Sequence, residues 1–126
     1  MPLTLLLERA VEQTKVLLVS SDLEEKVTDS LRHANCFVMK ARSGEAALAF
    51  AKHVAVDAFV LLSTGDAMGR TETALNLRDI RPCSEIILVA RDHATPTQGE
   101  VAAKAIPNTL VLTLQELRDH LAPLPM

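Results

Sequence analysis

The chain alternates between short runs of aliphatic residues and longer segments in which aliphatic residues recur at every third or fourth position. A run such as Val16 to Val19 is too short for a helix and has no polar alternation, which is typical of a strand buried on both faces. Three-to-four spacing is typical of amphipathic helices. These patterns predict strands at 16–19, 36–41, 58–62, 85–90 and 110–112, and helices at 22–34, 44–53, 71–81, 96–105 and 114–121.

Helix-capping residues support several of these boundaries. Ser21 with Glu24, and Thr113 with Glu116, each form the Ser/Thr-x-x-Glu pattern of a capping box at the start of a predicted helix. Pro96 stands at the first position of the fourth predicted helix, where its missing N–H group costs nothing. The capping patterns therefore predict helix starts at the places that the hydrophobic spacing gives.

Five strands that alternate with five helices predict an α/β domain with one parallel sheet, because right-handed crossovers place helices on both of its faces. Binding sites in such sheets form at the carboxyl ends of the strands. Ser20, Ser21 and Asp22 follow the first strand directly and mark the predicted edge of any site. The two serines fit either a ligand contact or, as we expect for Ser21, helix capping.

Composition narrows the classes of function. The 126 residues include no Trp or Tyr and only three Phe, and the net charge is −3 without a basic cluster, which argues against direct binding of nucleic acid. Cys36 and Cys83 are far apart in the sequence, as expected of isolated thiols in a reducing compartment. No run of 18 apolar residues and no signal peptide is found, so we expect a soluble, cytoplasmic protein without a membrane partner.

Residues 1–14 precede the first strand and form a predicted extension with a short helix over 3–13. This segment has no place in a five-stranded sheet, so it packs on its own domain, contacts another chain or frays. Its apolar stripe consists of Leu3, Leu6, Leu7, Ala10 and Val11. A second stripe, on the last predicted helix, consists of Leu114, Leu117 and Leu121. Because leftover apolar stripes tend to mark contacts, we expect a homodimer through one of these two segments.

Three phrases of the sequence resemble the response-regulator receiver domain, the phosphorylatable switch of two-component signalling. Residues 43–48 (Ser-Gly-Glu-Ala-Ala-Leu) are similar to the family's phrase before its second helix, and Ala90-Arg91-Asp92 to the phrase after its fourth strand. Residues 57–78 parallel the family's third strand, active-site loop and third helix without a gap. The resemblance implies a flavodoxin-like (βα)5 fold, with a doubly wound five-stranded parallel sheet, over residues 15–122, and leaves 123–126 as a tail.

The resemblance also implies where the phosphoryl group would be accepted. In receivers an aspartate at the end of the third strand is the nucleophile toward a phosphoryl donor. Counting from Asp57, and independently back from Glu72, places Leu62 at this position, and a shift of one residue places Ser63 there. Neither side chain carries a carboxylate.

The other three receiver positions also hold different residues. In the family, two acidic residues after the first strand help to hold Mg²⁺, a Thr or Ser ends the fourth strand and a Lys ends the fifth. Ser20 and Ser21 stand in place of the acidic pair, with only Asp22 beside them. Val89 stands in place of the Thr, and Lys104, before the last predicted strand, is the final lysine of the chain.

Four missing roles lead us to interpret the chain as a degenerate pseudo-receiver with no catalytic residue, metal site or cofactor. Its vestigial pocket consists of Ser20, Ser21, Asp22, Leu62, Ser63 and Val89. One carboxylate beside serines is a poor Mg²⁺ site, and no Cys or His lies in a nucleophile or metal motif. We expect a non-enzymatic, phosphorylation-independent protein-interaction or regulatory module of bacterial signalling or transcription regulation, either alone or within a longer polypeptide.

Two locations for a binding surface remain open. In active receivers, the face made by the fourth helix, fifth strand and fifth helix is the usual partner surface, which the resemblance maps to residues 96–122. The candidate partner residues are Pro96, Val101, Leu112, Glu116 and Arg118. One alternative is that this face is only a solvated exterior and that the partner binds elsewhere. Another is that the vestigial pocket senses a small ligand.

Overall fold

The computed structural model describes residues 13–21, 25–64, 69–90 and 98–121. Several predictions fall outside these residues: the N-terminal helix with its apolar stripe, Asp22, the Glu24 half of the first capping box, Pro96 and the tail at 123–126. The first strand begins at Thr14, the last residue of the predicted extension.

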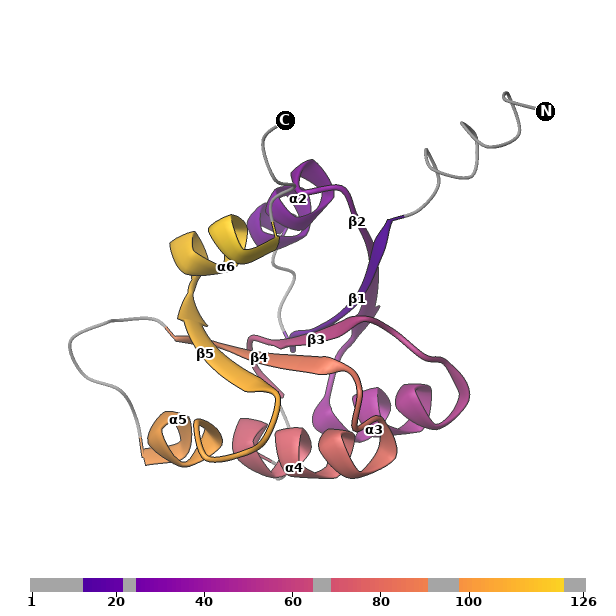
Figure 1. The fold of residues 1–126 in the computed structure, drawn as a ribbon. Helices are drawn as coiled ribbons and strands as arrows, with labels where there is room; N and C mark the ends of the chain where they lie inside the picture. The colour runs from indigo at the N-terminus through magenta and orange to yellow at the C-terminus, as the bar shows by residue number, and fades with distance from the viewer. Residues whose placement is uncertain (1–12, 22–24, 65–68, 91–97, 122–126) are drawn as a thin grey trace.

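Five parallel strands form one sheet in the order β2-β1-β3-β4-β5 (Figure 1). The strands are β1 (Thr14–Val19), β2 (Cys36–Ala41), β3 (Ala58–Leu61), β4 (Glu85–Ala90) and β5 (Thr109–Thr113). The three inner strands β1, β3 and β4 carry the buried aliphatic runs, whereas β2 and β5 form the edges. The sequence-based prediction of a doubly wound parallel sheet is therefore confirmed.

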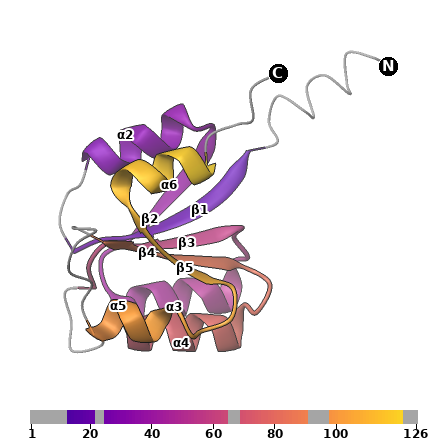
Figure 2. The same cartoon turned by 60° about the vertical axis from the view of Figure 1, so that its left-hand side comes forward.

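Helices cover both faces of this sheet (Figures 1 and 2). The first layer consists of α2 (Glu25–His33) and α6 (Leu114–Leu121), and the second of α3 (Gly44–His53), α4 (Arg70–Ile80) and α5 (Gln98–Ala103). Because successive strand residues point to opposite faces, Leu18 packs in the core under α2 and α6, whereas Leu17 packs in the core above α3 and α4. Phe59 is fully buried in the second of these cores.

The element boundaries differ from the predicted ones by one or two residues. Strand β5 extends one residue further at each end, to Thr109 and Thr113, which are buried polar residues that a search for aliphatic runs does not count. Helix α5 ends at Ala103, two residues early, where Ile106 N–H donates to its carbonyl oxygen in a tight turn. The predicted capping box of α6 is present: Thr113 N lies 2.9 Å from Glu116 Oε1, and Glu116 N lies 3.3 Å from Thr113 Oγ1.

Two turns bring the chain back into the sheet through asparagines. Asn35, between α2 and β2, has a φ of 63°, and Asn108, before β5, has a φ of 59°. Asparagine tolerates this left-handed region better than most other residues that have a Cβ. Asn108 Nδ2 also donates to the carbonyl oxygen of Ser84 at 2.9 Å, which ties β5 to the turn before β4. Across the described part of the chain, no helix is both long and apolar enough to cross a membrane.

Candidate functional site

The carboxyl ends of β1 and β3 meet through two serines. Ser63 Oγ lies 3.0 Å from the backbone nitrogen of Ser21 and 2.9 Å from Ser21 Oγ. These two residues follow neighbouring strands, which pair in register from Val16 with Ala58 to Val19 with Leu61. The pocket predicted from the sequence therefore contains a direct hydrogen-bonded contact across this edge, and this contact engages the hydroxyl of Ser21.

Leu62, the residue counted to the acceptor position, is held by both its backbone and its side chain. Its N–H group donates to the carbonyl oxygen of Val19 at 2.9 Å, which continues the pairing of β3 with β1. Its half-buried side chain packs against the core under α2 and α6. An aliphatic group in this position has no atom that can accept a phosphoryl group.

The other predicted pocket residues occupy the same edge but make separate contacts. The backbone nitrogen of Ser20 donates to the carbonyl oxygen of Ala41 at 2.9 Å, at the end of β2. Val89, near the end of β4, is 8% exposed and packs in the same core as Leu62. The structure thus brings Ser21 and Ser63 together. Ser20 bonds toward β2, and Val89 lies on β4, the strand on the other side of β3.

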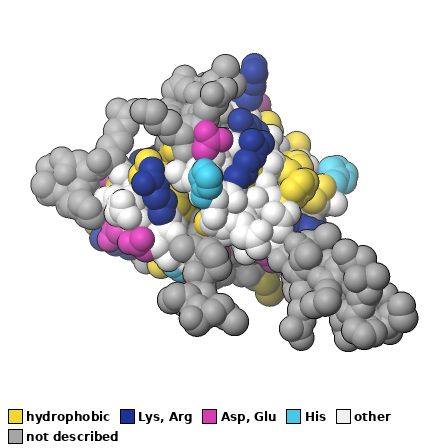
Figure 3. All heavy atoms as spheres, turned by 90° about the horizontal axis from the view of Figure 1, so that it is seen from above, with side chains coloured by type: hydrophobic (Ala, Val, Ile, Leu, Met, Phe, Trp, Pro, Cys, Tyr) yellow, Lys and Arg dark blue, Asp and Glu magenta, His cyan; other side chains and the backbone are white. Residues whose placement is uncertain are grey.

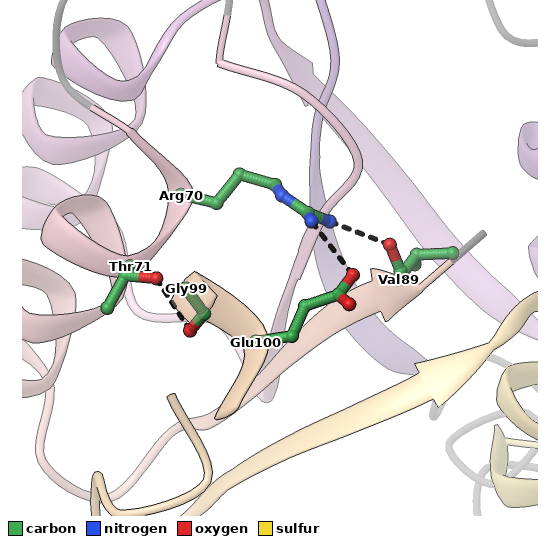
Figure 4. Close-up of polar contacts among 5 residues, drawn as sticks. All are labelled: Arg70, Thr71, Val89, Gly99 and Glu100. Atoms are coloured by element: carbon green, nitrogen blue, oxygen red, sulfur yellow. Dashed lines mark hydrogen bonds and ion pairs between the residues drawn. The ribbon is translucent and has the colours of Figure 1, made fainter. Parts of the chain in front are cut away.

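A second polar cluster, which the sequence did not reveal, lies beside Val89 at the start of α4 (Figure 4). Arg70 Nη1 donates to the carbonyl oxygen of Val89 at 2.6 Å, and Arg70 Nη2 pairs with Glu100 Oε2 at 3.1 Å. Thr71 Oγ1 donates to the carbonyl oxygen of Gly99 at 2.9 Å. We call these five residues, Arg70, Thr71, Val89, Gly99 and Glu100, the Arg70 bracket.

The Arg70 bracket is mostly shielded from solvent. The side chain of Glu100 is 5% exposed and that of Arg70 is 22% exposed. A carboxylate this deeply buried requires a partner for its charge, and the guanidinium supplies one. The bracket thereby ties the first turn of α4 to the end of β4 and to α5. No sequence signal indicates the pair, because its members are 30 positions apart and on different helices.

Few groups in the described ranges are suited to catalysis. Within them, no three His, Cys, Asp or Glu residues lie close enough to hold a metal ion. Cys36 is 2% exposed, and burial raises the pKa of its thiol, which lowers its reactivity as a nucleophile. Cys83 is exposed, and neither cysteine is part of a disulfide.

The residues predicted as a partner surface lie on two sides of β5. Val101 on α5 is 56% exposed. Leu112 on β5 is half-buried and packs toward the opposite layer, under α2 and α6. Glu116 forms part of the α6 cap, and Arg118 Nε donates to Ser30 Oγ on α2 at 3.2 Å. Arg118 therefore reaches across to α2, and Val101 is the most exposed apolar member of the predicted set.

Comparisons with known proteins identify the fold. No family model matches the sequence, and no curated protein matches it. Among solved structures, the chemotaxis protein CheY4 of Vibrio cholerae superposes with a TM-score of 0.72 at 22% identity, over 86% of this chain and 96% of that one. A CheY-like receiver domain protein from Methanospirillum hungatei superposes with a TM-score of 0.69 at 16% identity, over 87% of this chain and 94% of that one.

A third similar structure contains a phosphorylated aspartic acid. A response regulator from Burkholderia pseudomallei, with a phosphorylated aspartic acid and a calcium ion, superposes with a TM-score of 0.65 at 14% identity, over 79% of this chain and 59% of that chain. These likenesses show that the chain has the CheY-like receiver fold.

Proposed function

We propose that this domain is a pseudo-receiver that binds a protein partner independently of phosphorylation, as a non-enzymatic module of bacterial signalling or transcription regulation. The observation that carries this proposal is the identity of the residue that follows β3, Leu62. The half-buried aliphatic side chain of Leu62 stands where the receiver resemblance expects the acceptor aspartate, and the next residue, Ser63, is bonded to Ser21. The similar Burkholderia structure, in contrast, contains a phosphorylated aspartic acid.

The residues around Leu62 support the same conclusion. Mg²⁺ binds best to several hard oxygen ligands, carboxylates above all. The two positions after β1 hold Ser20 and Ser21, and the Ser21 hydroxyl already contacts that of Ser63. At the end of β4, Val89 offers an aliphatic side chain where the family has a hydroxyl for the phosphoryl oxygens. The hydrogen bond between Ser21 and Ser63 also makes this edge less suited to binding a small ligand, which is the alternative function of the pocket.

The Arg70 bracket supports a domain that does not need to switch. Receivers respond to a phosphoryl group at the carboxyl edge of the sheet, where the loops after β3 and β4 meet. Here Arg70 is the first residue of α4, and its guanidinium bonds both to the end of β4 and to Glu100 on α5. These contacts join α4, β4 and α5 through protein groups alone, and we expect the partner to bind the surface that these elements form.

We place the partner contact on the layer formed by α4 and α5. Val101 on α5 is 56% exposed and Leu75 on α4 is 42% exposed, and the two helices pack against each other. Exposed aliphatic side chains on adjacent helices are suited to an apolar contact with another protein. Val101 also belongs to the face that the receiver resemblance implies as the partner surface.

The experiment is a quantitative capture from a native bacterial extract with the immobilised domain. The same protein should be retained with and without beryllium fluoride and Mg²⁺, which together imitate the phosphoryl group. Val101→Asp should reduce its recovery at least tenfold, because a carboxylate would be desolvated in the contact. Phe37→Asp is the matched control: Phe37 is 51% exposed on the opposite sheet edge, β2, and its replacement should leave recovery unchanged. Capture that requires beryllium fluoride would contradict the proposal.

A further inference from the structure

A cavity of about 390 Å³ opens between helices α2 and α6, away from the carboxyl edge of the sheet and from the α4–α5 layer. The described residues that line it are Ser30, His33, Ala34 and Arg118. This volume is within the usual range of pockets for small molecules, roughly 300–1,000 Å³. Figure 3 looks onto this face of the molecule and shows Lys or Arg and His side chains on it, together with an acidic side chain beside them.

A hydrogen bond between the helices fixes the main polar group of the cavity. Arg118 Nε donates to Ser30 Oγ at 3.2 Å, which holds the side chain of Arg118 across from α2. A guanidinium has five N–H donors in a planar fork, of which this bond uses one. Within the described residues, no hydrogen bond or ion pair engages the two terminal nitrogens of Arg118. Four donors therefore remain for a ligand.

The chemistry of the lining favours a negatively charged ligand. The imidazole of His33 can donate a hydrogen bond in either tautomer. No carboxylate is among the described residues that line the cavity, although Asp29 and Asp119 are adjacent in sequence to two of them. Asp119 Oδ1 instead accepts from Gln115 Nε2 at 3.4 Å. The cavity thus combines a cationic fork and the imidazole donor of His33 with the apolar wall at Ala34.

We propose that this cavity is a binding site for a small organic anion, with its carboxylate or phosphate group on Arg118 and His33 and its apolar body against Ala34. The planar fork of Arg118 suits either oxyanion, because both accept two parallel N–H bonds. The site lies on the helix layer opposite to Val101, so it is independent of the partner surface proposed above. Anion binding there would add a ligand-responsive site to a domain whose phosphorylation pocket is filled.

The test is a ¹H–¹⁵N NMR titration of the whole chain with two probes, benzoate and phenyl phosphate, at constant ionic strength. Sodium chloride alone and benzyl alcohol are the reference titrations, for charge and for the aromatic ring. The proposal requires saturable shift changes at Ser30, His33, Ala34 and Arg118 Nε with at least one anionic probe and with neither reference. Comparing the affinities for benzoate and for phenyl phosphate distinguishes a carboxylate site from a phosphate site.

Substitutions assign the effect to the cavity. Arg118→Gln should weaken binding at least tenfold, and Arg118→Lys should weaken it less, because a lysine keeps the charge but loses the fork. Arg32→Gln is the matched control: Arg32 is an exposed cation on α2, next to His33, but it does not line the cavity, and its loss should change the affinity less than twofold. Shift changes that do not saturate, that chloride reproduces, or that Arg118→Gln leaves intact would overturn the proposal.

Discussion

The guanidinium of Arg70 lies 2.6 Å from the carbonyl oxygen of Val89 and thereby ties the first residue of α4 to the end of β4. The same side chain pairs with the buried carboxylate of Glu100 on α5. Three elements that are separate in sequence therefore meet at one cation, beside the edge where a receiver would hold its phosphoryl group. This arrangement makes Arg70 a stabilising residue of the edge at which Leu62 and Ser63 follow β3.

The first prediction concerns the stability contributed by this pair. Arg70→Gln should lower the free energy of unfolding by roughly 2–3 kcal/mol, because it removes the charged hydrogen bond between the guanidinium and the 5%-exposed side chain of Glu100. The double variant Arg70→Gln, Glu100→Gln should recover part of this loss, because no buried charge remains. The measurement is chemical denaturation followed by circular dichroism.

The control for this cycle is the Arg78–Asp79 pair. It is solvent-exposed, with side chains 37% and 66% exposed, so Asp79→Asn should change the free energy of unfolding by less than about 0.5 kcal/mol. A loss in Arg70→Gln no greater than that in Asp79→Asn would show that the Arg70 bracket does not stabilise the edge.

The second prediction concerns the two thiols. Burial raises the pKa of the Cys36 thiol, so at a given pH less of it is present as the reactive thiolate than for an ordinary cysteine. Cys36 is also 2% exposed, whereas Cys83 is exposed. Iodoacetamide at mildly alkaline pH should therefore alkylate Cys83 in the native protein and Cys36 only after unfolding, as read by peptide mass spectrometry. Equal rates at both thiols in the native state would contradict the placement of Cys36.

The general fold follows from the sequence because its strands are continuous aliphatic runs. Such runs can be satisfied only by a sheet covered on both faces, and the spacing between them fits one helix each. The edge of the candidate site follows from the same pattern, which places Ser21 and Ser63 at the ends of two strands. That their hydroxyls bond to each other does not follow, because it depends on the register of β1 against β3.

Contacts between distant side chains are the part that the sequence does not reveal. Arg70 and Glu100 are 30 positions apart, and Arg118 and Ser30 are 88 apart. Each pair joins two helices that are neighbours only because of the order of the strands beneath them. Spacing within one element carries information about that element's own faces, but not about which side chain of another helix lies opposite. The Arg70–Glu100 pair and the Arg118–Ser30 pair are therefore seen only in the folded structure.

The third prediction concerns the restoration of an acceptor. Leu62→Asp should not produce a phosphorylatable domain, because Ser20 and Ser21 still offer no carboxylate for Mg²⁺ and Val89 offers no hydroxyl. It should lower the free energy of unfolding by roughly 1–3 kcal/mol, because a charge replaces a half-buried side chain that packs on the core. The measurements are intact-mass spectrometry after incubation with acetyl phosphate, and chemical denaturation.

Leu62→Asn is the matched control for this substitution. Asparagine has the size of aspartate but no nucleophilic carboxylate, so both variants should remain unmodified by acetyl phosphate. A phosphoryl adduct on Leu62→Asp that is absent from Leu62→Asn would show that the remaining residues of the edge still form a working receiver site.

The most direct test of phosphorylation independence is made on the unaltered protein. The wild-type domain is incubated with acetyl phosphate and Mg²⁺, next to a receiver domain that retains its acceptor aspartate, and both are measured by intact-mass spectrometry. We predict a phosphoryl adduct on the reference receiver and none on this domain, because the receiver resemblance puts Leu62 at the acceptor position and Ser63 is bonded to Ser21. A stoichiometric adduct of one phosphoryl group on any residue of the wild-type domain would contradict the account.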